Sequence, residues 1–118
     1  MASIESRDFT SPDETRSPAK TRIELVGLAG GQVGRYTFEP GWRWSECIKP
    51  IANTDLCQTD HVGYVVSGTL NVKHADGSEA AITPGSVYHI AAGHDGWNAG
   101  SEPVVVLEFQ GAAGYAKG

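Results

Sequence analysis

The chain has 118 residues and a formal net charge of −5. This length suits one domain with a single core and is too short for a second. An acidic chain without a basic stripe argues against nucleic acid and anionic membranes as partners, so we expect a small molecule or another protein.

Residues 1–20 are rich in Ser, Thr, Pro and charged residues and contain almost no apolar side chains. Such a segment cannot bury enough surface to offset its ordering entropy, so we expect a flexible arm. It has no apolar stretch typical of a signal peptide, and no run in the chain approaches the roughly 18 apolar residues of a membrane span. We therefore expect a cytoplasmic protein. In a reducing compartment Cys47 and Cys57 are each a buried thiol or a metal ligand rather than a disulfide.

From residue 21 onward, short β-branched and aromatic runs alternate with Gly, Pro, Asn and Asp, and no helical periodicity lasts beyond a turn or two. Turn signals lie at 67–68, 76–77 and 84–85. We predict strands near residues 23–28, 34–38, 55–57, 61–66, 69–74, 79–82, 86–90, 96–98 and 104–109. Short strands at this spacing favour an all-β sandwich or barrel spanning residues 21–110. The Gly- and Ala-rich residues 111–118 are expected to form a flexible tail.

Two sequence segments resemble the two motifs of the cupin superfamily. Residues 64–68 (YVVSG) match the end of the first motif, and Pro84-Gly85 followed by residues 90–94 (IAAGH) matches the second. Residues 40–45 (PGWRWS) and 93–97 (GHDGW) further resemble a subgroup of small bacterial cupins. This resemblance implies a double-stranded antiparallel β-helix, or jelly-roll barrel, with a site inside it. It also implies a homodimer, for which Trp42 and Trp44 are candidate contact residues.

The resemblance also suggests metal ligands. Counting back from Gly68, the two histidines of the family motif fall on Asp55 and Cys57, and its glutamate falls on His61. His94 takes the place of the late histidine if the hairpin is two residues shorter. We therefore expect Cys57, His61 and His94 to bind one metal ion, with Asp55 and Cys47 as weaker candidates.

Thiolate and imidazole are suitable ligands for a divalent transition metal ion, with zinc or iron as the first expectation. Three protein ligands leave a position open for water or substrate, which is typical of catalytic rather than structural sites. Each of the three side chains has a simpler alternative, because a buried Cys, a hydrogen-bonded barrel His and a loop His need no metal.

For the pocket beside the metal we expect Val65, Trp97, Trp44 and Tyr64. The catalytic residues stay unassigned, since Asp95, Glu46 and Tyr64 are the only further candidates for a general base and no motif supports them. Three functions remain open: a metal-dependent enzyme acting on a small organic molecule, a module that binds a small ligand or metal without turnover, and a barrel with a structural metal or none.

Overall fold

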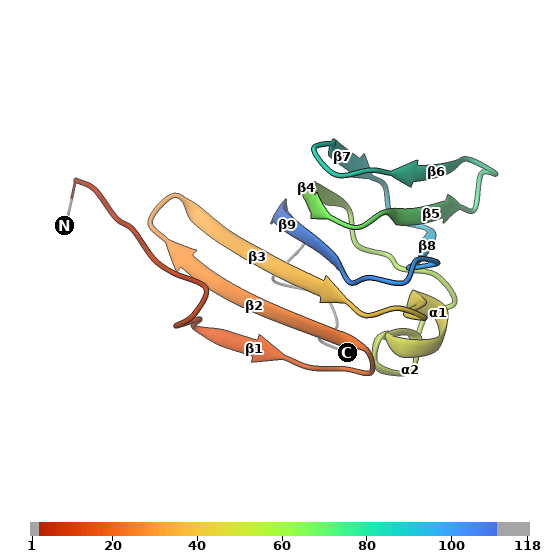
Figure 1. Cartoon of the computed structure of the whole chain (residues 1–118), viewed down its shortest axis with the longest axis horizontal. Helices are drawn as coiled ribbons and strands as arrows, with labels where there is room; N and C mark the ends of the chain where they lie inside the picture. Colours follow the sequence, from red (N-terminus) through yellow and green to blue (C-terminus); the bar gives the residue numbers. More distant parts are fainter. Residues whose placement is uncertain (1–2, 111–118) are drawn as a thin grey trace.

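The computed structural model describes residues 3–110, so the expected tail at 111–118 lies outside the described residues. Figure 1 shows the order of the elements along the chain. They are β1 (Glu14–Arg16), β2 (Thr21–Leu28), β3 (Gly31–Phe38), α1 (Trp44–Cys47), α2 (Lys49–Ala52), β4 (His61–Ser67), β5 (Leu70–His74), β6 (Glu79–Ile82), β7 (Val87–Ile90), β8 (His94–Trp97) and β9 (Val104–Gln110).

The strands form two sheets. One has six strands in the order β1-β2-β3-β9-β4-β7, and the other has three in the order β6-β5-β8. Every pairing within them is antiparallel. β9, the last strand, lies between β3 and β4, so the chain returns to the middle of the larger sheet at its end (Figure 1). The expected all-β, double-sheet antiparallel barrel is confirmed.

The core lies between the two sheets. On β9 the side chains of Val104, Val106 and Glu108 are buried and alternate with less buried neighbours, as the two-residue period of a strand requires. On β5, in the smaller sheet, Leu70 and Val72 join the same core cluster. Glu108 is the polar exception among these inward positions, and it belongs to the site described below.

The outer face of β2 and β3 carries a partly buried ion pair. Glu24 and Arg35 are register partners, and the Arg35 guanidinium donates two hydrogen bonds of 3.0 Å to the two carboxylate oxygens of Glu24. The same guanidinium lies 4.9 Å from the ring centroid of Phe9. Residues before β1 therefore cover this side of the sheet.

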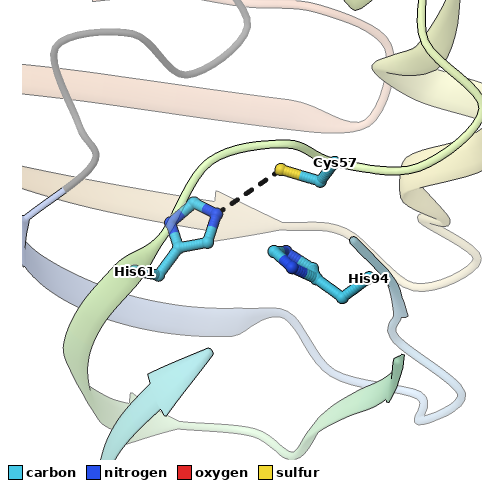
Figure 2. Close-up of side chains that lie close together, drawn as sticks. All are labelled: Cys57, His61 and His94. Atoms are coloured by element: carbon cyan, nitrogen blue, oxygen red, sulfur yellow. Dashed lines mark hydrogen bonds between the residues drawn. The ribbon is translucent and has the colours of Figure 1, made fainter. Parts of the chain in front are cut away.

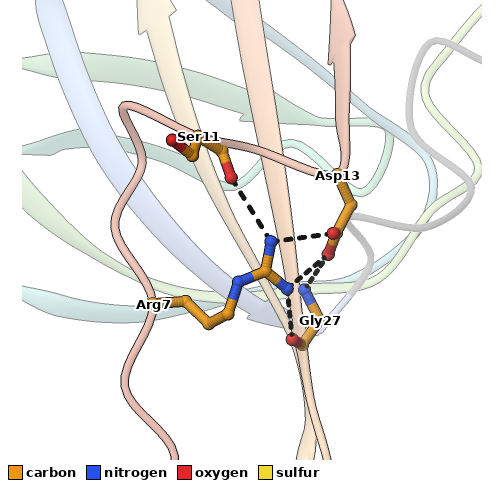
Figure 3. A network of polar contacts seen from close by, with 4 residues as sticks. All are labelled: Arg7, Ser11, Asp13 and Gly27. Carbon is orange, nitrogen blue, oxygen red and sulfur yellow. Dashed lines mark hydrogen bonds and ion pairs between the residues drawn. The ribbon is translucent and has the colours of Figure 1, made fainter.

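Part of the segment expected to be a flexible arm pairs with the sheet. Residues 14–16 form β1, which the sequence did not predict, and an arginine ties the preceding residues to β2 (Figure 3). Arg7 donates to both carboxylate oxygens of Asp13, at 3.1 and 2.8 Å, and to the carbonyl oxygens of Gly27 and Ser11. The Asp13 carboxylate also accepts the Gly27 amide at 2.7 Å. A polar segment can thus be ordered by hydrogen bonds that its composition does not reveal.

The connection from β3 to β4 differs from the prediction. It contains the four-residue helices α1 and α2, which are too short to produce a periodic pattern. The strand predicted at 55–57 is wrong, because Cys57 makes one isolated bridge with His94 instead of a continuous pairing. Within residues 3–110, no helix is long and apolar enough to cross a membrane.

Candidate metal centre

Three side chains that are far apart in the sequence converge inside the barrel (Figure 2). Cys57 comes from the loop before β4, His61 is the first residue of β4, and His94 is the first residue of β8. Their potential ligand atoms all lie within 4.8 Å of one another. Cys57 Sγ is 3.6 Å from His61 Nε2, and the two imidazole centroids are 5.1 Å apart. Exposure is 3% for Cys57, 4% for His61 and 5% for His94, so the group is buried.

The backbone holds Cys57 against His94. The Cys57 amide donates to the His94 carbonyl at 2.8 Å, and the Gly93 amide donates to the Cys57 carbonyl at 2.7 Å. Gly93 has a φ of 97°, a conformation that glycine adopts at little cost. The turn before β8 therefore fixes the two side chains next to each other although 36 residues separate them.

Both histidines use Nδ1 to bind the protein. His61 Nδ1 lies 2.5 Å from Glu108 Oε1, and His94 Nδ1 lies 2.8 Å from the carbonyl oxygen of Ala91. A carboxylate and a carbonyl are acceptors, so each Nδ1 carries the proton and donates it. The lone pair of a neutral imidazole is then on Nε2, which is the pattern that metal-binding histidines show.

Glu108 is a site residue that the sequence reasoning missed. It is buried, and its second carboxylate oxygen accepts a hydrogen bond from the Tyr88 hydroxyl. Gly63 on β4 makes this contact possible, because a Cβ there would lie 2.5 Å from the Tyr88 hydroxyl oxygen. A signal was present in the sequence, since residue 108 is a lone acid at an inward position of the apolar run VVVLEFQ.

The histidines and Glu108 lie at the edge of a cavity inside the barrel. Its enclosed volume is about 30 Å³, and it is partly open to solvent. Most of its wall is aromatic or aliphatic. The lining residues are Tyr36, Phe38, Trp42, Trp44, His61, Leu70, Val72, Tyr88, Ile90, His94, Gly96, Val106 and Glu108.

Comparison with known proteins identifies the fold. No known family model and no curated protein matches the chain by sequence. A cupin-superfamily sugar phosphate isomerase from Silicibacter pomeroyi matches its structure with a TM-score of 0.62 and 21% identity, over 88% of this chain and 73% of that one. A cupin domain from Bordetella pertussis matches with a TM-score of 0.53 and 18% identity, over 80% and 96%. The chain has the cupin fold.

A third structural match is a protein named for a different activity. The polyketide cyclase RemF from Streptomyces resistomycificus matches with a TM-score of 0.63 and 13% identity, over 89% of this chain and 77% of that one. At such identities the likeness establishes the cupin fold and not the activity, because one fold supports many chemistries. The resemblance to the PGWRWS subgroup of cupins stays a prediction.

The donor set of this cupin-fold chain fits a transition metal ion. Burial alone would raise the pKa of the Cys57 thiol, but hydrogen bonds from His61 and His94 outweigh it and lower that pKa to about 6. Burial alone would lower the pKa of His61, but its hydrogen bonds to Cys57 and Glu108 raise that pKa to about 9. At neutral pH the sulfur is therefore a thiolate, the form that binds metal, and a metal ion would displace the proton on His61 Nε2. Cys57, His61 and His94 form a group that could hold such an ion.

The two weaker ligand candidates are not part of this group. The Asp55 side chain is 97% exposed and pairs with the Lys49 ammonium at 3.2 Å, because the loop before Cys57 turns it toward solvent. Cys47 is partly buried, packs against the core from α1 and is not among the converging ligand atoms. In this structure neither side chain lies with Cys57, His61 and His94.

Of the four expected pocket residues, one lines the cavity and three do not. Trp44 lines the cavity, whereas Val65, Tyr64 and Trp97 do not. Val65 is fully buried elsewhere in the core. Tyr64 and Trp97 occupy outward positions, since they alternate with the buried positions of β4 and β8.

The other aromatic and acidic candidates have structural partners. Trp42 and Trp44 are buried within the chain, so neither offers a surface for the subunit contact that we expected of them.

The Asp95 carboxylate accepts the Ser45 amide at 3.1 Å and pairs with Arg43, which lies 4.6 Å from the Trp97 ring centroid. Asp95 and Tyr64 thus lie on outward faces. The Glu46 side chain is largely exposed and pairs with Arg43. None of these three candidates for a general base is in the cavity wall.

Proposed function

We propose that this chain is a metal-binding cupin domain in which Cys57, His61 and His94 hold one divalent transition metal ion beside a cavity for a small organic molecule. The observation that carries the proposal is the orientation of the two imidazoles. Both Nδ1 atoms face hydrogen-bond acceptors of the protein. One potential ligand atom from each of Cys57, His61 and His94 lies within 4.8 Å of the other two.

The ligand types favour zinc or iron(II). A thiolate and two imidazoles suit these ions, whereas magnesium or calcium would require several oxygen ligands. Three protein ligands also leave a coordination position open. A bound ion of this kind supplies Lewis acidity, which polarises a carbonyl group or lowers the pKa of a bound water. In this site Cys57, His61 and His94 would hold the ion, and Glu108 would keep His61 oriented.

The cavity wall supports an apolar ligand rather than a phosphorylated one. Among the described residues that line it there is no Lys or Arg, and the carboxylate of Glu108 would repel an anion. A sugar phosphate, the kind of compound named for the Silicibacter pomeroyi isomerase, is therefore a poor fit. The aromatic and aliphatic lining suits a compound more like those on which a polyketide cyclase such as RemF acts.

A second candidate is binding without turnover. Its support is that both oxygens of Glu108, the carboxylate in the cavity wall, are already engaged by His61 and Tyr88. The described cavity wall thus offers no uncommitted carboxylate as a general base. Turnover assays with the metal-loaded protein distinguish this candidate from an enzyme.

The metal site is tested by elemental analysis of protein purified without a histidine tag. We expect about one equivalent of zinc or iron per chain, and loss of that metal in Cys57→Ala and His94→Ala. Cys47→Ala and His89→Ala are matched controls, since Cys47 lies outside the ligand group and His89 is exposed on β7. Metal well below one equivalent in the parent protein, or retained in both ligand variants, would contradict the proposal.

We also propose that two copies of this chain associate. The cytoplasmic location stays a prediction. The support is a set of exposed apolar side chains on adjacent strands of the larger sheet: Val66, Val87 and Phe109. Light scattering during gel filtration measures the mass, and a monomer at micromolar concentration would contradict the association.

A further inference from the structure

The enclosed cavity beside His61 and His94 is too small for a whole organic molecule. One water needs about 10–15 Å³ of such space. The volume of about 30 Å³ therefore holds about two waters. Pockets that enclose most of an organic ligand have roughly 300–1,000 Å³. An organic molecule that reaches the proposed metal ion must keep most of its body outside this cavity.

A larger groove lies directly beside the cavity, between β6 of the smaller sheet and β7 of the larger one, which are neighbours in Figure 1. Its volume is about 320 Å³. Val72 on β5 and Ile90 at the end of β7 line both the groove and the cavity. Ile90 is also the register partner of His61. The wall that the two spaces share therefore lies next to a proposed metal ligand.

The groove exposes apolar side chains on the inner face of β6. Ala80 is the register partner of the core residue Val72, so both lie on this face, and Ile82 follows two residues later on the same side. Ala80 is nevertheless exposed, and Ile82 is only partly buried. Ile90 and Ala91 line the groove from the side of β7. Such a surface suits the hydrocarbon part of a ligand, because contact with it removes apolar area from water.

A carboxylate is held in place where the β5–β6 turn lines the groove. His74 Nε2 donates to the Ala92 carbonyl oxygen at 2.8 Å, and His74 Nδ1 accepts the Asp76 amide at 3.0 Å. The Asp76 carboxylate accepts the Ser78 amide at 2.8 Å, and its side chain is 62% exposed. Asp76 therefore presents a negative charge to a molecule in the groove from a fixed position.

The charges along the groove favour a cation over an anion. Its described lining contains the carboxylates of Asp76 and Glu79 and no Lys or Arg. Lys73 is the register partner of Glu79 and offsets part of its charge, so Asp76 is the main source of negative potential. An ion pair in such an exposed place changes affinity by a small factor only. The apolar walls therefore supply most of the binding, and Asp76 selects the sign of the charge.

We infer that this groove binds the body of an elongated, mostly apolar molecule with an amino group beside Asp76, and that the other end passes between Val72 and Ile90 to the metal centre. The inference rests on the proposed function for what lies at the inner end. It adds the place and the chemical class of the ligand, and it names Ala80 and Asp76 as residues that determine specificity.

The test titrates three six-carbon probes into the ¹⁵N-labelled full chain at pH 8, with and without zinc. Hexylamine is cationic, hexanol is neutral and hexanoate is anionic, while the hydrocarbon chain stays the same. We expect hexylamine to bind about threefold or more tightly than hexanol, as one exposed ion pair allows, and hexanoate to bind most weakly. The largest changes in the ¹H–¹⁵N spectra should fall on the amides of Ala80, Ile90 and Ala91.

Two pairs of variants separate the apolar wall from the charge. Ala80→Phe should fill the groove and abolish binding of all three probes, whereas Ala81→Phe, on the opposite face of β6, should keep it. Asp76→Asn should abolish the preference for hexylamine over hexanol. The exposed Glu102→Gln, outside the groove, should keep that preference.

The passage to the metal centre is tested with cobalt(II) in place of zinc. A paramagnetic ion speeds the relaxation of nearby protons, so the methyl end of bound hexylamine should relax faster than the methylene group beside its nitrogen. The zinc-loaded chain is the diamagnetic control. Equal relaxation of the two ends, or faster relaxation at the nitrogen end, would overturn the passage between Val72 and Ile90.

Hexanoate binding as tightly as hexylamine would overturn the inference, as would binding that survives in Ala80→Phe. If Ala80→Phe does not fold, the positions of the spectral changes and the Asp76→Asn comparison still decide. A chain that holds one zinc but binds no probe would contradict this inference and leave the metal site intact. A chain that takes up no metal but prefers hexylamine through Asp76 would support the groove and contradict the metal site.

Discussion

Glu108 and His61 are joined by a hydrogen bond of 2.5 Å between Oε1 and Nδ1, in the interior of the barrel. This contact connects the last strand of the larger sheet with the first residue of β4. It orients the imidazole so that Nε2 points toward Cys57. Glu108 is therefore a positioning residue for a metal ligand.

The role of Glu108 predicts a graded effect of substitution. Glu108→Ala should weaken zinc binding by about 10- to 100-fold, the usual effect of removing such a partner. Glu108→Gln should weaken it less, because an amide oxygen still accepts the Nδ1 proton. Competition with a chelator of known affinity measures both. The exposed Glu102→Gln is the control, and an Ala variant with the affinity of the parent protein would remove Glu108 from the site.

Removing the metal should destabilise the protein. A ligand at 100 times its dissociation constant stabilises the folded state by about 2.7 kcal/mol. We therefore expect a chelator to lower the Tm of the zinc-loaded chain by several degrees, as followed by circular dichroism. Cys47→Ala should respond like the parent protein, whereas Cys57→Ala should not respond. An equal response of the two variants would show that Cys57 is not a ligand.

Gly63 predicts a packing effect on the site. A Cβ at this position would lie 2.5 Å from both the Tyr88 hydroxyl and the Leu107 carbonyl oxygen, so Gly63→Ala must displace a strand or the tyrosine. We expect a loss of about 1–3 kcal/mol in the free energy of unfolding, measured with urea. Gly30→Ala is the matched control, because nothing lies within 4 Å of a Cβ there. Equal stability of the two variants would contradict the predicted crowding.

The Glu24–Arg35 pair predicts a pH dependence. The hydrogen bond from Arg35 holds the pKa of Glu24 below its usual value. A carboxylate with a lowered pKa in the folded state stabilises the fold above its ordinary pKa, and this contribution is lost as pH falls through the lowered value. Glu24→Gln should therefore lower the Tm at pH 7, and its difference from the parent protein should shrink toward pH 3. A difference that stays constant over this range would argue against the ion pair.

Arg7 predicts the order of the N-terminal segment. Because its guanidinium joins Asp13, Ser11 and Gly27 (Figure 3), Arg7→Ala should release the residues before β1. We expect faster cleavage within residues 3–13 by a protease such as thermolysin, while the rest of the barrel stays resistant. Arg22→Ala, on a largely exposed side chain of β2, is the control. Cleavage of the parent protein at the same rate would favour the flexible arm.

Local patterns were sufficient to predict the barrel. The two-residue alternation, the glycine turns and the cupin-like segments around Gly68 and Pro84-Gly85 are short-range features, and they correctly indicated two antiparallel sheets. Gly68 shows why such a position depends on one residue type. It has a φ of 73°, and a Cβ there would lie 2.6 Å from the Pro103 carbonyl oxygen. The helices α1 and α2 escaped prediction because four residues carry no period.

The sequence by itself determined the barrel and nominated Cys57, His61 and His94, which the structure brings together. The tertiary structure alone decided their surroundings. It paired Glu108 with His61, turned Asp55 to solvent and enclosed Trp42 in the cavity wall. The physical reason is that these outcomes depend on contacts between strands and loops far apart in the chain, whereas alternation and spacing report only which face of its own strand a residue occupies.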